Sequence, residues 1–151
     1  MAEAFGGNNR VLVINPYTPA RTEFFAQGGT AIAATSKDTG KPVVLDGQHV
    51  DLAASGEEIY GFIESVEVGT KNGYNYGGVL CDPGCEVYAT DEVGTLWVGD
   101  LVVAGTATAV GTETPVTGAN VIAGIPATHK WQVMARYTAG SCAGGVLLRK
   151  V

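Results

Sequence analysis

Residues 95–109 read TLWVGDLVVAGTATA, and this stretch decides the fold. Two apolar runs, 96–98 and 101–104, flank a Gly-Asp pair at 99–100. Short runs that are rich in β-branched residues and interrupted by glycine are typical of strands joined by tight turns. The stretch therefore predicts a core hairpin in which Trp97 is buried and the Gly-Asp pair forms the turn or a bulge.

The same pattern of short apolar runs and turns continues through most of the chain after Lys41. Its clearest turn signals are Asp46-Gly47, Asn72-Gly73 and Asp82-Pro83-Gly84. Gly61, inside the longest run, marks a bulge or a close backbone contact. The predicted strands cover residues 42–45, 50–52, 59–68, 79–81, 85–90, 96–98, 101–104, 121–125, 129–137 and 146–151, and the small β-branched run continues over 106–111. About ten short strands separated by turns predict an all-β barrel or sandwich.

Residues 1–41 lack this periodicity. They are predicted to form an extended, mostly irregular N-terminal arm on a β-barrel or β-sandwich domain of residues 42–151. Within the arm, residues 10–14 suit an edge strand and residues 19–27 suit about two helical turns. An arm without its own core lies against its own domain or a partner, because too little burial opposes the entropy of ordering.

The charge balance excludes several classes of function. The net charge is −6, and residues 42–100 hold one lysine against eleven acidic residues. An acidic middle argues against a nucleic-acid groove, which needs clustered Lys and Arg. No window approaches ~18 consecutive apolar residues, so no membrane span is predicted. The acidic residues serve either solubility or a face that meets a basic partner.

The reactive side chains do not form a catalytic motif. Cys81 and Cys85 lie across a turn, which suits buried thiols, a disulfide in an oxidising setting, or half of a zinc site. Cys142 lies in a Gly-rich loop, and a cysteine hydrolase would need His49 or His129 as its base. No phosphate loop, nucleophile elbow or dinucleotide fingerprint is present. We therefore predict no catalytic residue, no metal and no cofactor.

Four short motifs give the chain a recognisable layout. They read GKPVVL at 40–45, VDLA at 50–53, IYGFI at 59–63 and VGDLVV at 98–103, and they follow a Gly- and Ala-rich N-terminal segment. This layout resembles the head decoration, or capsid cement, proteins of tailed bacteriophages. The resemblance implies a small β-barrel or β-tulip domain with an extended N-terminal arm, and no enzymatic activity.

The resemblance also implies a place and a partner. Such proteins bind the outer surface of an icosahedral shell built from a major capsid protein, often as homotrimers, and reinforce the expanded head. The chain is then made in the host cytoplasm and resides in the virion, with neither nucleic acid nor membrane as a partner. In the arm, Arg10 and Arg21 would pair with charges of the shell, and Phe24 and Phe25 would be apolar anchors. Packing of the two phenylalanines on the chain's own domain is the alternative.

Two other interpretations remain open at the level of sequence. A phage tail or fibre module that binds host glycans would use Tyr74, Tyr76 and Trp97 as a sugar platform. Tyr74 and Tyr76 also suit an oligomer or surface contact. A small enzyme would use Cys142, or a metal held by Cys81 and Cys85.

Overall fold

The computed structural model describes residues 20–25, 36–67, 75–106, 119–140 and 143–151. This part of the chain is all-β, as predicted, with ten strands and one short 3-10 turn. The elements are β1 (Arg21–Phe24), η2 (Ser36–Asp38), β2 (Pro42–Asp46), β3 (His49–Leu52), β4 (Gly61–Ile63), β5 (Tyr76–Leu80), β6 (Glu86–Asp91), β7 (Leu101–Ala104), β8 (Asn120–Ala123), β9 (Trp131–Arg136) and β10 (Gly145–Lys150). No helix in the described ranges is long and apolar enough to cross a membrane.

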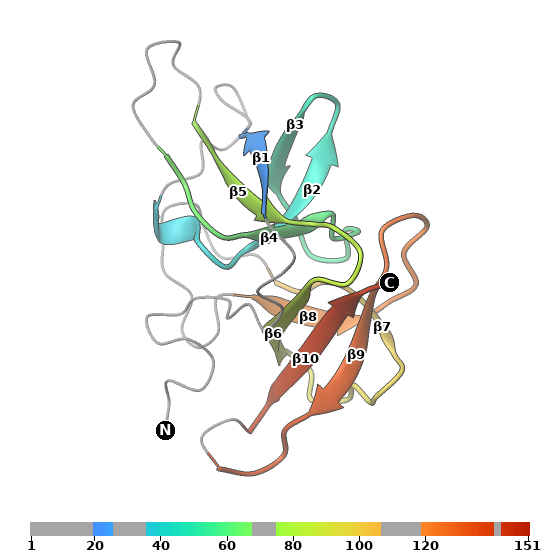
Figure 1. The fold of residues 1–151 in the computed structure, drawn as a ribbon. Coiled ribbons are helices and arrows are strands. Elements are labelled where there is room, and N and C mark those ends of the chain that lie inside the picture. Colours follow the sequence, from blue (N-terminus) through green and yellow to red (C-terminus); the bar gives the residue numbers. More distant parts are fainter. Residues whose placement is uncertain (1–19, 26–35, 68–74, 107–118, 141–142) are drawn as a thin grey trace.

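The strands form two units that lie one above the other in Figure 1. The first, here called the sheet lobe, is an antiparallel sheet in the order β1-β5-β4-β2-β3. The second is a closed barrel in the order β10-β6-β8-β7-β9, which confirms the predicted barrel. Within the barrel, β6 and β8 pair in parallel and the other neighbours are antiparallel. A parallel bridge pairs Phe25, directly after edge strand β1, with Val50 of the other edge strand, β3.

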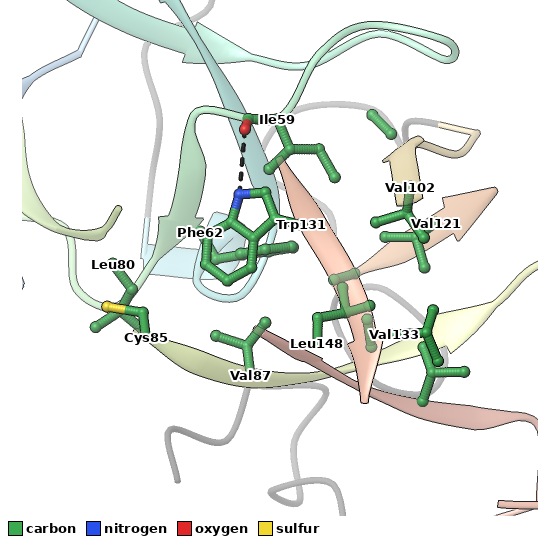
Figure 2. Packing of buried hydrophobic residues seen from close by; sticks show 14 of the residues in the cluster. Ile59, Phe62, Leu80, Cys85, Val87, Val102, Val121, Trp131, Val133 and Leu148 are labelled. Atoms are coloured by element: carbon green, nitrogen blue, oxygen red, sulfur yellow. Dashed lines mark hydrogen bonds between the residues drawn. The ribbon is translucent and has the colours of Figure 1, made fainter. Parts of the chain in front are cut away.

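The main hydrophobic core joins the two units. Trp131 of β9 lies at its centre, fully buried, and its ring meets Phe62 of β4 edge-on at 4.8 Å between centroids. The Trp131 indole Nε1 donates a hydrogen bond to the Ile59 carbonyl oxygen at 3.1 Å (Figure 2). A buried Trp N–H needs such a partner, and here the partner comes from the other unit. The sheet lobe and the barrel therefore share one core.

A second, smaller core lies within the sheet lobe. Along β4, Phe62 belongs to the main core, whereas Ile63 belongs to the smaller one. This division follows from the two-residue period of a strand, which sends successive side chains to opposite faces. The members of the smaller core are Phe25, Val43, Val50, Tyr60, Ile63, Val79 and Cys81.

Several local predictions are confirmed. Asp46 and Gly47 begin the turn between β2 and β3, with Gly47 at a φ of +61°. The turn after β5 is closed by Cys85 N–H donating to the Asp82 carbonyl at 3.1 Å. Gly61 is a close backbone contact, since a Cβ there would lie 2.5 Å from the Leu80 carbonyl oxygen. Asn72-Gly73 lies outside the described residues.

Three local predictions are wrong. The helix predicted within 19–27 is replaced by strand β1, which pairs with β5 in the register Arg21 to Val79. The backbone groups along β5 provide hydrogen-bond partners that a local propensity does not take into account. The long strand 59–68 shortens to β4, with one isolated bridge at Glu67. Residues 96–98 form no strand.

The end of the predicted arm is built into the sheet lobe. Asp38 of η2 is fully buried and pairs with the buried Lys41 at 2.7 Å. The backbone N–H of Gly40 donates to the Ile63 carbonyl at 2.7 Å, which ties this segment to β4. Strand β1 and the segment 36–41 thus both pack on the domain that follows them.

Candidate functional site

The most exposed large aromatic side chain of the described residues is Trp97, in the segment 92–100 between β6 and β7, here called the Trp97 loop. Trp97 is 66% exposed, and Val98 and Val93 are exposed to a similar degree. Leu96, its neighbour, is fully buried in the main core. The predicted core hairpin is therefore wrong: the inward position is Leu96, one residue earlier than expected, and this places Trp97 on the surface.

Two carboxylates hold the Trp97 loop in shape. Asp91, buried at the end of β6, accepts hydrogen bonds from the backbone N–H groups of Gly94 and Leu96, each at 2.9 Å. Asp100 accepts from the Trp97 N–H at 2.8 Å. Aspartate side chains commonly stabilise turns by bonding to nearby backbone N–H groups in this way. The carboxylates at the two ends of the loop thus fix its backbone conformation.

The loop is also tied to the barrel through β9. The Gly99 N–H donates to the Val133 carbonyl at 2.8 Å, and the Val133 N–H donates to the Asp100 carbonyl at 2.9 Å. The Gln132 side-chain amide donates to the Gly99 carbonyl at 3.0 Å. In Figure 1 this loop is the yellow segment beside β9 in the lower unit. Exposed apolar side chains on such a firmly held loop lose little freedom on binding.

Arg136, at the end of β9, completes the surface. Its guanidinium carbon lies 4.6 Å from the centroid of the Trp97 ring, and its Nη2 donates to the Gly94 carbonyl at 3.0 Å. We call Val93, Trp97, Val98 and Arg136 the Trp97–Arg136 patch. Trp and Arg are the residues that most often dominate the energetics of protein interfaces. A cavity of about 180 Å³ adjoins the patch; its lining residues include Asp91, Arg136 and Tyr137.

A second group of ionisable residues lies where the two units meet. Lys150 of β10 is buried, and its Nζ donates to the Tyr60 carbonyl at 2.6 Å and lies 3.4 Å from His129 Nδ1. Burial lowers the pKa of the Lys150 ammonium. Burial, followed by the charge of Lys150, lowers the pKa of His129. An amine with a lowered pKa is a candidate nucleophile in principle, but Lys150 is only 5% exposed and its ammonium donates to the Tyr60 carbonyl.

Glu58 faces the same junction and is used structurally. It accepts hydrogen bonds from the backbone N–H groups of Ala127, Thr128 and His129. Burial acts to raise the pKa of Glu58, but these three hydrogen bonds outweigh it and the pKa is lowered. A carboxylate held in this way fixes the β8–β9 connection to the sheet lobe, and its oxygens are occupied.

Cys81 and Cys85 are buried thiols. Cys81 belongs to the core of the sheet lobe and Cys85 to the main core, so they face different sides of the turn and form no disulfide. Burial raises the pKa of both thiols, which makes them poor nucleophiles. The described residues contain no group of three or more His, Cys, Asp or Glu side chains placed to hold a metal. Cys142 lies outside the described residues.

The residues predicted to contact a partner have mixed outcomes. Phe25 is 1% exposed in the core of the sheet lobe, so the anchor prediction is corrected in favour of packing on its own domain. Arg21 forms an ion pair with Asp82 at 2.6 Å within the chain. Tyr76 is partly exposed at the start of β5. Arg10, Tyr74 and the side chain of Phe24 lie outside what the structure describes.

Of the three proposed sugar-platform residues, Tyr76 belongs to β5 of the sheet lobe, whereas Trp97 belongs to the loop that joins β6 and β7 of the barrel. Tyr74 lies outside the described residues. Sequence reasoning singled out Trp97 but missed Arg136, because their contact joins segments about 40 residues apart. The signal available for the loop scaffold was Asp91 followed three residues later by a glycine, which is typical of an Asx-stabilised turn. No protein-family model and no curated protein matches this chain.

Proposed function

We propose that this chain is a structural protein of a phage virion, which binds the outer surface of the capsid and stabilises the expanded head. The observation that carries the proposal is the Trp97–Arg136 patch, a preformed surface on the β-barrel that suits contact between the repeated copies of an assembly. Such a surface suits an assembly protein, and the resemblance in sequence layout points to the class of assembly. Homotrimer formation and residence on the outer capsid are part of the same proposal.

The ionisable residues support a role without catalysis. Lys150, His129 and Glu58 hold the sheet lobe against the barrel, and the thiols of Cys81 and Cys85 are enclosed in hydrophobic cores. A protein that reinforces a shell needs rigidity and many weak contacts, which repetition over identical copies strengthens through avidity.

The direct test uses expanded heads that lack this chain, assembled from the major capsid protein of the phage that encodes it. The purified chain is expected to sediment with these heads at saturating, regular stoichiometry and to raise the temperature at which they rupture. Heads that neither bind the chain nor gain thermal stability would refute the proposal.

A glycan-binding module is the second candidate, because an exposed Trp97 beside a cavity of about 180 Å³ is a plausible stacking surface for a sugar ring. A glycan array distinguishes the two functions. Specific binding that is lost in Trp97→Ala, with no affinity for heads, favours the glycan module.

A further inference from the structure

We propose that the Trp97–Arg136 patch of one copy docks into an acidic groove on the sheet lobe of a neighbouring copy. The inference deepens the proposed function, since it assigns the contact between copies within the proposed homotrimer and leaves contact with the shell to other surfaces. Its two halves are both present on the chain, one on the barrel and one on the sheet lobe.

The groove lies along β2 and β3. A cavity of about 400 Å³ is lined by Val44, Leu45, Asp46, Asp51, Leu52 and Glu57, together with Ala54. A second cavity of about 260 Å³, between the sheet lobe and the β8–β9 connection, shares Val44 and Leu45 with the first. We call the two together the acidic groove. The larger cavity is lined by four apolar side chains and three carboxylates and by no Lys or Arg, and the lining of the smaller one includes Glu58 and His129.

The apolar parts of the two surfaces match in kind. Two large hydrophobic side chains are exposed on the described strands of the sheet lobe, Leu45 and Tyr76. Leu45 is 45% exposed. On the barrel, Trp97 and Val98 are exposed in the Trp97 loop, and Val93, Ile125 and Val151 are exposed as well. Exposed apolar side chains rimmed by polar groups are typical of protein interaction sites. An indole packed against the exposed Leu45 would remove apolar area from water on both copies.

The charges are complementary as well. Among the described residues Arg136 makes no ion pair, and its guanidinium uses one of its five N–H donors, on the Gly94 carbonyl. The carboxylates of Asp91 and Glu92 are engaged on both oxygens, Asp91 by two backbone N–H groups and Glu92 by the backbone N–H and hydroxyl of Thr106. Arg136 therefore has donors available for the carboxylates of a partner.

In the acidic groove, Asp51 and Glu57 each accept one backbone N–H on one oxygen, and Asp46 Oδ2 lies 3.4 Å from His49 Nε2. Within the described part of the chain, the second oxygen of each of these carboxylates remains to accept from the guanidinium.

This contact is heterologous, because the patch and the groove are different surfaces. A heterologous contact generates a closed ring when the rotation between copies closes, and an open filament when it does not. A ring of three copies satisfies every patch and every groove. The geometry points to a second copy in preference to a nucleic acid, because the groove is acidic.

The test is a complementation experiment on the full chain, followed by sedimentation velocity. Arg136→Glu disables the patch and Leu45→Arg disables the groove. Leu45 is exposed and Arg136 is partly exposed, so each variant is expected to keep the fold, as circular dichroism checks. Each variant alone is expected to be monomeric, with self-association at least tenfold weaker than in the wild type, a typical effect at an interface hot spot (~1.4 kcal/mol or more). A one-to-one mixture has one intact patch facing one intact groove, and is expected to form a heterodimer that cannot close.

The matched controls are Lys130→Glu, at the opposite end of β9 from Arg136, and Tyr76→Arg, the other exposed hydrophobic position of the sheet lobe. Both are expected to assemble like the wild type. Wild-type chain that stays monomeric, variants that assemble normally, or a mixture that stays monomeric would each overturn the inference.

Binding to heads, measured in parallel, separates this inference from the proposed function. Wild-type monomers that still coat heads would overturn the copy-to-copy contact and leave the proposed function standing. Loss of head binding in Leu45→Arg with normal self-association would place the shell in the groove and overturn the inference. Rings that form as expected but ignore heads would leave the inference standing and refute the proposed function.

Discussion

Adjacent substitutions at residues 96 and 97 are expected to have opposite consequences for stability. Leu96 is fully buried in the main core, so Leu96→Ala removes buried methyl groups and leaves a cavity, at a cost of about 2–5 kcal/mol. Trp97 is 66% exposed, and its main described interaction is the contact with Arg136. At an exposed site such a cation–π contact contributes about 0.5–1 kcal/mol, so Trp97→Ala is expected to cost no more than that.

Thermal unfolding followed by far-UV circular dichroism measures the difference. In a chain of this length, 1 kcal/mol shifts Tm by about 2–4 °C. We expect Leu96→Ala to lower Tm by roughly 4–20 °C, and Trp97→Ala to lower it by no more than about 4 °C. Urea unfolding at 25 °C provides an independent free energy for both variants.

Fluorescence provides the control for local structure. The chain has two tryptophans, Trp97 and the buried Trp131. In the wild type, iodide is expected to quench only the Trp97 emission, and the Trp97→Ala variant is expected to show a single blue-shifted emission that iodide does not reach. A Trp97→Ala variant as unstable as Leu96→Ala would refute the assignment of Trp97 to the surface.

Three further predictions test other parts of the structure. Gly61→Ala places a Cβ 2.5 Å from the backbone oxygen of Leu80, and is expected to cost about 1–3 kcal/mol in urea unfolding; a neutral result would contradict the close approach. Burial lowers the pKa of Lys150 in the folded state. Between this lowered pKa and the unfolded pKa of ~10.4, the unfolded chain binds more protons than the folded chain, so the free energy of unfolding rises with pH. The stability of the wild type relative to Lys150→Met is therefore expected to increase from pH 7 to pH 10 in chemical denaturation, and parallel pH profiles would argue against this. Cys81 and Cys85 are expected to resist iodoacetamide until the chain unfolds, as peptide mapping checks; rapid labelling of the native chain would show that their burial is incomplete.

The fold class and several of its details could be predicted from local sequence. The sequence predicts a strand over 129–137, and β9 spans Trp131–Arg136 within that range. The Asp46-Gly47 pair predicted the hairpin between β2 and β3. Gly61 predicted a close backbone contact, and the structure has one. These features depend mainly on residues that are close in sequence, so a local sequence pattern can predict them.

What only the tertiary structure decided is which side chains face inward and which distant groups meet. The run around Trp97 contains apolar residues in succession, so its pattern does not fix the inward position, and a shift of one residue exchanges the two faces. The hydrogen bonds of Asp91 and Asp100 and the packing of Leu96 in the barrel fix that position and turn Trp97 outward. The contact of Arg136 with Trp97 likewise depends on β9 lying beside the loop, a relation between distant segments. The sequence by itself therefore determined an all-β chain with its turns, and the closed barrel decided where its exposed binding surface lies.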